Sequence, residues 1–228
     1  MKRILCFGDS NTWGYISGSN HQRYNENERW TKLLQKFLGA EFEVIEEGLN
    51  SRTLCSQDKR KGKEFTNGFS YLIPCLQTHD KVDAVVLMLG TNELKFAYNN
   101  TPQNIFQMFL KYVDIITNYK SQIDGCVSKL IVCGVPPIDD TTTYCITENK
   151  FVNASKMRPE LNNLMRDFCH KQKILFVDNS DLKVGIDGVH LTLESHKILA
   201  KKLEKLVLEN LWKGSKNGED NWIFNREI

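Results

Sequence analysis

The sequence predicts an α/β protein in which helices cover both faces of an open parallel β-sheet. Short apolar runs of strand length alternate along the chain with longer segments whose apolar residues recur at helical spacing. Strands that alternate with helices pair in parallel through right-handed crossovers, which place the helices on the two faces of the sheet. Polar residues follow three of these runs, and a parallel sheet gathers such residues along one edge.

Five runs are predicted to be strands. Each is short and largely apolar, which is typical of a strand that is buried in a parallel sheet. In chain order they are Arg3–Phe7, Phe42–Glu46, Ala84–Leu89, Leu130–Cys133 and Ile174–Asp178. We therefore expect a sheet of about five parallel strands.

The predicted helices carry apolar residues at intervals of three and four. They are marked by Trp30–Leu38, Ile105–Ile116, Leu161–Phe168 and Leu199–Leu211. Gly39 suits a C-cap after the first helix, and Thr101 followed by Pro102 suits the start of the second. The last helix is expected to end near Trp212.

Length and composition favour one globular domain. The chain has 228 residues, of which 41% are hydrophobic and 25% charged, and this balance is ordinary. Residues 1–212 are predicted to form the domain, and the tail at 213–228 is expected to pack on it or on a neighbouring subunit. The net charge of +2 argues against nucleic acid or an anionic membrane as a required partner. The basic residues between Lys59 and Lys63 are interpreted as a solvated loop.

The seven cysteines include no Cys-x-x-Cys pair, which argues against a disulfide framework or a zinc site. Cys6 and Cys133 lie in strand-like runs, and Cys75 and Cys169 lie in helix-like runs, so we expect buried, reduced thiols. The chain contains no apolar stretch long enough for a signal peptide or a membrane span. A cytoplasmic protein without a bound metal is therefore expected.

Residues that suit a hydrolytic site lie at both ends of the sequence. Ser10 lies in the turn Gly8–Gly14 directly after the first predicted strand. A serine is a poor nucleophile unless a base activates it and an acid orients that base. Asp187 and His190 supply both groups within one short loop. Together these residues predict serine-based catalysis.

The sequence blocks resemble the SGNH hydrolases, also called the GDSL esterase and lipase family, in which four blocks contribute Ser, Gly, Asn and His. The matching residues, in the family's order, are Ser10, Gly48, Asn92 and His190. Further matches resemble the arylesterase and acyltransferase branch: Trp13-Gly14, Ser51-Arg52-Thr53 and Pro136-Pro137. The resemblance implies the three-layer, flavodoxin-like α/β/α sandwich of the SGNH hydrolase fold.

The resemblance also implies a role for each residue of the site. Ser10 attacks an ester carbonyl, His190 takes and later returns the proton, and Asp187 holds the imidazole. The backbone N–H groups of Ser10 and Gly48 and the side-chain amide of Asn92 form the oxyanion hole. Neither a metal nor an organic cofactor is implied.

Further residues are expected to support the site or to line its pocket: Asp9, Asn11, Trp13, Tyr15, Arg52 and Glu93. Asp9 is predicted to accept hydrogen bonds from backbone N–H groups of its own turn, and Arg52 to brace the loop after the second strand. Asn11 stands where the family usually has Leu, and Glu93 stands where it commonly has Asp. His196 is interpreted as a packing or capping residue.

The predicted function is a serine ester hydrolase that acts through an acyl-enzyme on short-chain acyl or aryl esters, a small-molecule substrate class. Acyl transfer to an alcohol is expected to compete with hydrolysis, and a carbohydrate O-acetyl esterase is an alternative that uses the same site. Two non-enzymatic alternatives are a flavodoxin-like module that binds a phosphate or nucleotide in the Gly8–Gly14 turn, and an inactive relative. The branch also implies a homo-oligomer. The irregular segment Ile138–Asn153 is expected to wall the pocket or to contact another subunit.

Overall fold

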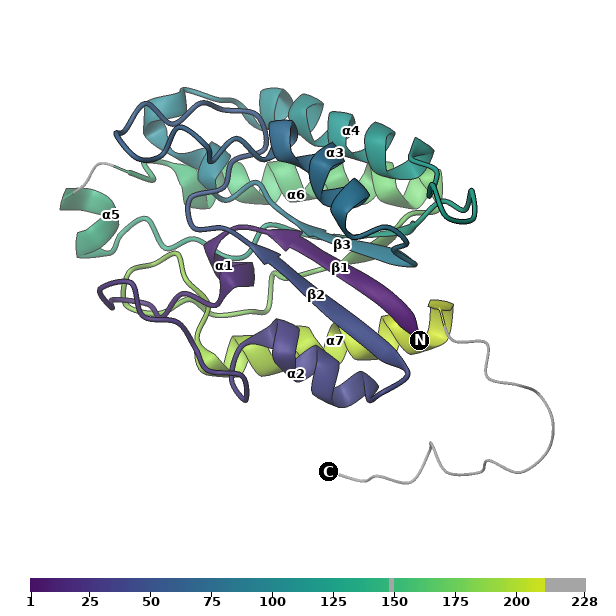
Figure 1. The fold of residues 1–228 in the computed structure, drawn as a ribbon. Coiled ribbons are helices and arrows are strands. Elements are labelled where there is room, and N and C mark those ends of the chain that lie inside the picture. Colours follow the sequence, from purple (N-terminus) through teal and green to yellow (C-terminus); the bar gives the residue numbers. More distant parts are fainter. Residues whose placement is uncertain (148–149, 212–228) are drawn as a thin grey trace.

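The computed structural model describes residues 1–147 and 150–211 of the chain. At its centre lies one parallel sheet with the strand order β2-β1-β3-β4-β5 (Figure 1). The strands are β1 (Lys2–Gly8), β2 (Phe42–Gly48), β3 (Ala84–Met88), β4 (Lys129–Cys133) and β5 (Leu175–Val177). The parallel sheet of five strands is therefore confirmed, and each strand lies where the sequence predicts it.

Helices cover both faces of the sheet and form the expected three layers (Figure 1). Helices α2 (Trp30–Leu38) and α7 (Leu193–Leu211) lie on one face, and α3 (Gly68–Thr78), α4 (Pro102–Asn118) and α6 (Ala154–Gln172) lie on the other. Short elements occupy the connecting segments: α1 (Ser10–Trp13), η1 (Asn92–Leu94), η2 (Phe96–Tyr98) and α5 (Thr143–Thr147). Within the described residues, no helix is both long enough and apolar enough to cross a membrane.

The two faces of β1 explain why its run Ile4–Phe7 is entirely apolar. Leu5 and Phe7 pack into the layer of α3, α4 and α6, whereas Ile4 and Cys6 pack into the layer of α2 and α7. All four side chains are fully buried. Because both faces of the strand are covered at these four positions, apolar side chains stabilise it at each of them, and the polar alternation of a half-exposed strand is absent there.

The ends of two helices agree with the signals in the sequence. Thr101 caps α4, because its hydroxyl accepts a hydrogen bond from the backbone N–H of Asn104 at 3.2 Å, and Pro102 is the first helical residue. Gly39 follows α2 with a φ of 73°, a backbone angle that glycine adopts without strain. The start of α4 and the end of α2 are therefore determined by residues next to them in the sequence.

Helix α7 ends at Leu211, which is also the last residue that the structure describes. The expected helix end near Trp212 and the tail at 213–228 lie outside the described residues. The division into a domain at 1–212 and a packed tail therefore stays a prediction.

The segment Ile138–Asn153, expected to be irregular, contains the short helix α5 and packs against the loop that carries Asp187. The backbone N–H of Asp139 donates to the carbonyl of Gly188 at 2.8 Å, and the Thr142 hydroxyl donates to the carbonyl of Asp187 at 3.2 Å. The segment therefore fixes the backbone of this loop from outside. A contact with another subunit stays a prediction.

The carboxyl end of β1 is the switch point of the sheet, because β2 pairs with one side of β1 and β3 with the other. In open parallel sheets, ligands bind in the crevice outside the strand ends at such a point. The turns after β1, β2 and β3 carry Ser10, Ser51 and Asn92, and all three residues line one pocket. The fold thus brings three separate turns to a single site.

Candidate active site

Ser10 opens the short helix α1 directly beyond β1. Asp9 caps this helix, because its carboxylate accepts a hydrogen bond from the backbone N–H of Asn11 at 2.9 Å. Burial raises the pKa of Asp9, although the Asn11 N–H and the charge of His190 act in the opposite direction. The Asp9 side chain therefore holds in place the turn that carries Ser10.

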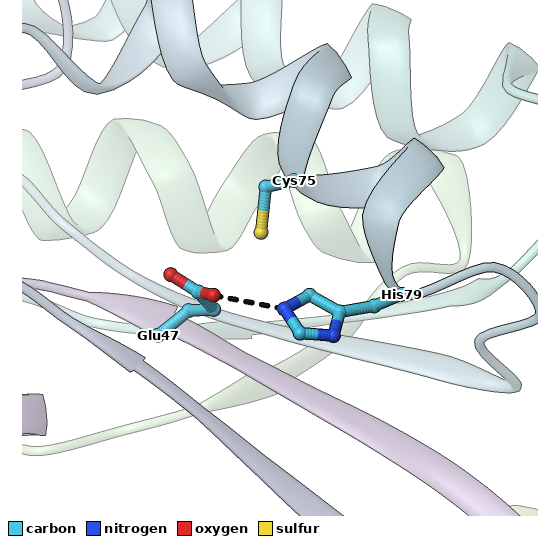
Figure 2. A group of neighbouring side chains, drawn as sticks. All are labelled: Glu47, Cys75 and His79. Atoms are coloured by element: carbon cyan, nitrogen blue, oxygen red, sulfur yellow. Dashed lines mark hydrogen bonds and ion pairs between the residues drawn. The ribbon is translucent and has the colours of Figure 1, made fainter.

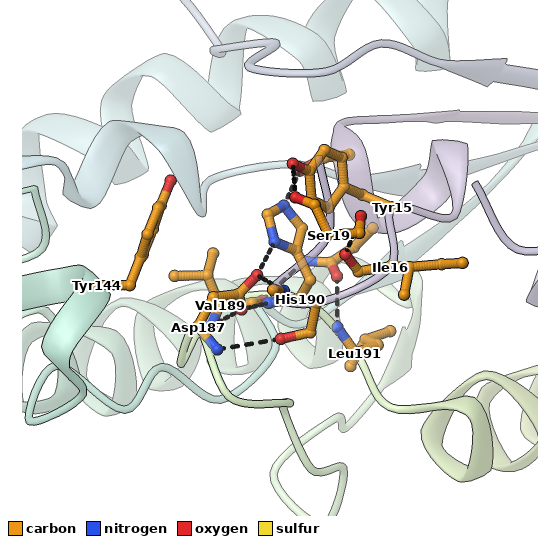
Figure 3. Close-up of polar contacts among 12 residues, drawn as sticks. Tyr15, Ile16, Ser19, Tyr144, Asp187, Val189, His190 and Leu191 are labelled. Carbon is orange, nitrogen blue, oxygen red and sulfur yellow. Dashed lines mark hydrogen bonds and ion pairs between the residues drawn. The ribbon is translucent and has the colours of Figure 1, made fainter. Parts of the chain in front are cut away.

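Ser10, His190 and Asp187 form a continuous chain of hydrogen bonds. The Ser10 Oγ lies 2.9 Å from Nε2 of His190, although 180 positions separate the two residues in the sequence. On the other side of the ring, Nδ1 of His190 lies 2.7 Å from Oδ2 of Asp187 (Figure 3). This is the arrangement in which an imidazole can take a proton from a serine while a carboxylate fixes its tautomer.

Asp187 is held as an acceptor from several directions. Its Oδ1 accepts hydrogen bonds from the backbone N–H groups of Val189 and His190, each at 3.0 Å, and its Oδ2 accepts one from Gly18 at 3.2 Å. Burial alone would raise the pKa of Asp187, but the hydrogen bonds and the positive charge available on His190 hold it well below its usual range. The carboxylate therefore stays ionised beside the imidazole.

Asn11 joins the turn that carries Ser10 to the loop that carries His190. Its side-chain amide donates to the carbonyl of Val189 at 3.3 Å and accepts from the backbone N–H of Leu191 at 2.9 Å. The side chain is almost completely buried, at 1% exposure, so both hydrogen bonds are shielded from water. Asn11, which stands where the family usually has Leu, thus holds the backbone on both sides of His190.

Tyr15 covers one face of the His190 ring. The two ring centres are 4.3 Å apart with an angle of 27° between the planes (Figure 3). The Tyr15 hydroxyl donates to the carbonyl of Ser19 at 2.9 Å, which fixes the phenol ring in turn. Tyr15 also lines the pocket, as its place just after the nucleophile predicts.

Asn92 and Ser51 supply polar hydrogens next to Ser10. The Asn92 side-chain nitrogen donates one hydrogen to the carbonyl of Arg52 at 3.0 Å, and its second hydrogen has no acceptor among the described residues. Ser51 has a φ of +70°, an uncommon backbone angle for a residue with a side chain. Its backbone N–H has no acceptor within the described part of the chain. Both groups lie at the pocket where an ester carbonyl would meet Ser10.

The expectation that the Gly48 N–H joins the oxyanion hole requires correction. The N–H of the next residue, Leu49, donates across to the carbonyl of Gly8 at 3.1 Å. Successive N–H groups along a strand point to opposite sides, so the Gly48 N–H points away from β1 and from Ser10. Gly48 also does not line the Ser10 pocket, and its Cα lies against the backbone of Trp13. Glycine is needed there for close packing, and Ser51 takes the position that faces the pocket.

Trp13 and Arg52 lie outside the Ser10 pocket. The Arg23 guanidinium lies 5.1 Å from the centre of the Trp13 ring, so the tryptophan packs beneath a surface cation. Arg52 donates to the carbonyls of Gly8, at 3.0 Å, and Glu47. These contacts tie together the ends of β1 and β2, which is the bracing role that the sequence predicts for Arg52.

Glu93 supports a neighbouring loop and not the Asn92 amide. Its Oε1 accepts hydrogen bonds from the backbone N–H groups of Cys55 and Ser56, at 2.8 and 3.2 Å, and its Oε2 accepts from Asn100 at 3.2 Å. The side chain is fully buried. The Glu93 carboxylate, which is one methylene longer than the Asp common in the family, therefore anchors the backbone that follows Arg52. The Asn92 amide keeps its hydrogen bond to the Arg52 carbonyl.

The pocket at Ser10 has a volume of about 370 Å³, which suits a small molecule. Its lining comes from five parts of the chain: the turn after β1, the loop after β2, η1 with Lys95, the segment around α5, and the loop that carries His190. Most of the residues that line it carry polar side chains, whereas Phe151 and Val189 are apolar. A pocket of this size with a mixed lining fits a short ester with polar substituents.

One cluster outside this site has the ligand types of a metal centre. Glu47, Cys75 and His79 place their ligand atoms within 4.8 Å of one another (Figure 2). The Glu47 carboxylate already contacts His79 at 2.8 Å and faces the Arg52 guanidinium at 3.8 Å. Burial, with the charge of Glu47, raises the pKa of the Cys75 thiol to about 12. The cluster is therefore satisfied as an ion-paired network, and the cation next to Glu47 is an arginine.

Comparisons with known proteins agree with this geometry. A sequence model described as GDSL-like lipase/acylhydrolase matches residues 4–203. The chain is 33% identical to a solved aryl esterase from M. smegmatis, with a TM-score of 0.84, over 92% of this chain and 99% of that chain. It is 30% identical to a carbohydrate acetylesterase from Sinorhizobium meliloti, with a TM-score of 0.84 and the same coverage of both chains. A putative arylesterase from Agrobacterium tumefaciens is 26% identical, with a TM-score of 0.82 over 92% of this chain and 99% of that chain. No curated protein sequence matches the chain.

Proposed function

Because this chain belongs to the GDSL-like lipase and acylhydrolase family and is a carboxylic ester hydrolase, we propose that Ser10, His190 and Asp187 carry out its reaction through an acyl-enzyme. The observation that supports this assignment is the hydrogen-bonded chain from the Ser10 Oγ through both ring nitrogens of His190 to the Asp187 carboxylate. Each of the three groups has the partner that its role requires.

In the first step, the Ser10 Oγ attacks the ester carbonyl and its proton passes to Nε2 of His190. The imidazolium that forms faces the ionised Asp187, which stabilises the positive charge and keeps the ring in place. The same ring then returns the proton to the departing alcohol, and the acyl group stays on Ser10. Tyr15 limits the rotation of the ring because it is stacked on one face.

The tetrahedral oxyanion would receive hydrogen bonds from the backbone N–H groups of Ser10 and Ser51 and from the Asn92 amide. These donors come from three different turns, each fixed at the end of a strand or by buried hydrogen bonds. Donors that are already in place stabilise the developing charge without reorganisation, and the loss of one costs on the order of 3–4 kcal/mol of barrier stabilisation. In this proposal Ser51 replaces Gly48 as the donor after β2.

The acyl-enzyme would then be cleaved by water, or by an alcohol: His190 takes a proton from the incoming hydroxyl as it attacks the acyl carbonyl, and returns that proton to the Ser10 Oγ as the acyl group leaves. The pocket volume of about 370 Å³ favours short acyl groups and small aryl alcohols. The hydroxyl and amide side chains in its lining can form hydrogen bonds with an alcohol that competes with water. We therefore keep short-chain acyl or aryl esters as the proposed substrates, with acyl transfer as a second outcome at the same site.

A carbohydrate acetyl ester is the second candidate substrate. The observation in its favour is the pocket lining, which offers hydroxyl, amide and ammonium groups to the hydroxyls of a sugar. A relative at 30% identity is described as a carbohydrate acetylesterase. The homo-oligomer and the cytoplasmic location expected from the sequence stay predictions.

The experiment that tests the proposal measures hydrolysis of p-nitrophenyl acetate, butyrate and hexanoate by the wild-type protein and by Ser10→Ala. We expect release by the wild-type protein that declines from acetate to hexanoate, and loss of nearly all release in the variant. Ser180→Ala is the matched control, because Ser180 lies in an exposed turn and hydrogen-bonds Asp178. Equal rates for Ser10→Ala and the wild-type protein would reject Ser10 as the nucleophile.

A further inference from the structure

The pocket at Ser10 is lined by an excess of positive charge. Arg60, Lys63, Lys95 and Lys150 all lie on its wall, and they come from three different segments. Within the described residues, the single carboxylate of the lining is Asp187, which is already engaged by His190. The protein as a whole carries a net charge of only +2, so this concentration of cations is local.

Lys95 is the cation nearest to the proposed oxyanion donors along the chain. It follows η1, and its backbone N–H donates to the carbonyl of Asn92 at 3.3 Å. The side chain is partly buried, and no carboxylate of the described residues lies within ion-pair distance of its ammonium group. Burial, together with repulsion from Arg60, lowers the pKa of Lys95 to about 8. An ammonium group in this position would gain from a bound anion.

The other cations lie in the same part of the pocket. Arg60 is oriented by Asp58, whose Oδ1 lies 2.9 Å from the arginine Nε. The Lys150 ammonium lies 3.1 Å from the hydroxyl of Tyr144 in the same segment. Arg60, Lys95 and Lys150 also line a second hollow of about 470 Å³ next to the first. Arg60, Lys95 and Lys150 therefore lie on the wall that the two hollows share.

We propose that the substrate of this site is an ester that carries a carboxylate group, which the cations around Lys95 bind while Ser10 attacks the ester carbonyl. The inference rests on the proposed function, since it assigns the substrate class of the same pocket. A carboxylate would replace the missing counter-charge of Lys95 and contact Lys63 or Arg60 without moving Asp187. Charge-assisted hydrogen bonds of this kind are about twice as strong as neutral ones.

The test compares esters that differ in charge. The first pair places the charge on the alcohol: 4-acetoxybenzoate and its methyl ester, which has the chemically better leaving group. The second pair places it on the acyl group: mono-4-nitrophenyl adipate and 4-nitrophenyl hexanoate. We expect kcat/KM to favour the anionic member of at least one pair by about tenfold, and this preference to shrink as ionic strength rises. A preference for the neutral member in both pairs, or none in either, would overturn the inference.

Variants identify the side chain that binds the carboxylate of the substrate. Lys95→Gln is expected to lower kcat/KM for the preferred anionic ester by about tenfold and to leave its neutral partner nearly unchanged, while Lys95→Arg restores the preference. Lys61→Gln is the matched control, because Lys61 is exposed in the same loop as Arg60 and lines neither hollow. An equal loss on charged and neutral esters in Lys95→Gln would mean that Lys95 has only a structural role, and the inference would fail.

A binding measurement separates this inference from the proposed function. Calorimetry with Ser10→Ala and each of the two anionic esters, 4-acetoxybenzoate and mono-4-nitrophenyl adipate, measures affinity where no turnover is expected. Binding that weakens about tenfold in the double variant Ser10→Ala/Lys95→Gln supports the anion site even if the serine mechanism is wrong. Hydrolysis of p-nitrophenyl acetate that depends on Ser10, together with no such binding, would leave the serine mechanism intact and reject the anion site.

Discussion

Two histidines that are six residues apart in the sequence have opposite environments. The His190 ring is held between Ser10 and Asp187 and faces the pocket. The His196 ring is completely buried, and its Nδ1 accepts a hydrogen bond from the backbone N–H of Trp30 at 3.2 Å. Burial, with the charge of His190, lowers the pKa of His196 to about 3.

The proposed base differs from the structural histidine in two respects: it has a carboxylate partner, and it has access to the pocket. The imidazole itself is the same in both. His190 has an ionised acid on one nitrogen and a hydroxyl on the other. His196 has no acid partner among the described residues, and its Nε2 is buried without a hydrogen bond. It therefore stays neutral and acts as an acceptor that joins α7 to the start of α2, the packing or capping role that the sequence predicts.

The largest expected effect comes from the removal of His190, the member of this pair that faces the pocket. His190→Ala is expected to lower kcat on p-nitrophenyl acetate by about 10⁴-fold or more, because Ser10 then has no base. The free energy of unfolding should change by less than about 1 kcal/mol, since the ring is at the pocket and not in the core. His170→Ala, on the exposed face of α6, is the control. Full activity of His190→Ala would remove the contrast between the two histidines.

The second effect concerns the carboxylate that distinguishes the two rings. Asp187→Asn is expected to lower kcat by about 10³–10⁴-fold, because an amide can donate to Nδ1 and then favours the wrong tautomer. Steady-state kinetics with circular dichroism would separate this loss from misfolding. A loss of less than tenfold would mean that the geometry of the loop, and not the charge of Asp187, prepares His190.

The third effect concerns the buried ring and appears as a pH dependence of stability. The folded-state pKa of His196, about 3, lies below its ordinary value of 6.5, so the unfolded chain binds a proton that the folded chain excludes between these values. This contribution is complete above pH ~6.5 and falls by about 1.4 kcal/mol per unit as the pH drops below it. Urea unfolding at pH 7 and pH 5 measures it. His196→Gln keeps an acceptor and should flatten the slope; an unchanged slope would assign the effect to other groups.

The smallest effect tests how the loop that carries His190 is held. Asn11→Leu restores the family's usual residue but leaves the Leu191 N–H and the Val189 carbonyl without their partners. We expect kcat to fall by about tenfold with little change in KM, and stability to fall by about 1–3 kcal/mol. Asn11→Asp keeps the acceptor for the Leu191 N–H and should recover part of kcat. A change in KM alone would show that Asn11 acts on substrate binding and not on the position of His190.

The fold was accessible from the sequence because its signals are local. Strands β1, β3 and β4 contain apolar runs that are buried on both faces, and Thr101 and Gly39 mark helix ends without distant help. The association of Asp187 with His190 was equally accessible, because a spacing of three residues places both in one loop. Family resemblance then joined this loop to Ser10 across the chain.

Other features of the site depend on three-dimensional detail that no local pattern carries. The Gly48 N–H points away from Ser10, which follows from the pairing of Leu49 with Gly8. The hydrogen bonds of Asn11 join positions about 180 residues apart and cannot be derived from its neighbours in sequence.

The basic loop between Lys59 and Lys63 shows the same limit. Its sequence is typical of a solvated surface, and Lys59 and Lys61 are indeed exposed. Arg60 and Lys63 of the same loop nevertheless line the Ser10 pocket. The number of cations in this loop can be counted in the sequence. Which of them point into the pocket depends on how the loop packs.

The most direct test of the serine mechanism is to trap the acyl group. The protein is mixed with p-nitrophenyl acetate, quenched in acid during the first turnover and analysed by intact mass and peptide mapping. We predict one acetyl group on the peptide that contains Ser10, formed as fast as the first p-nitrophenol is released and absent from Ser10→Ala. A rapidly formed acetyl group on a different residue, or first-turnover release without any covalent adduct, would contradict the proposed mechanism.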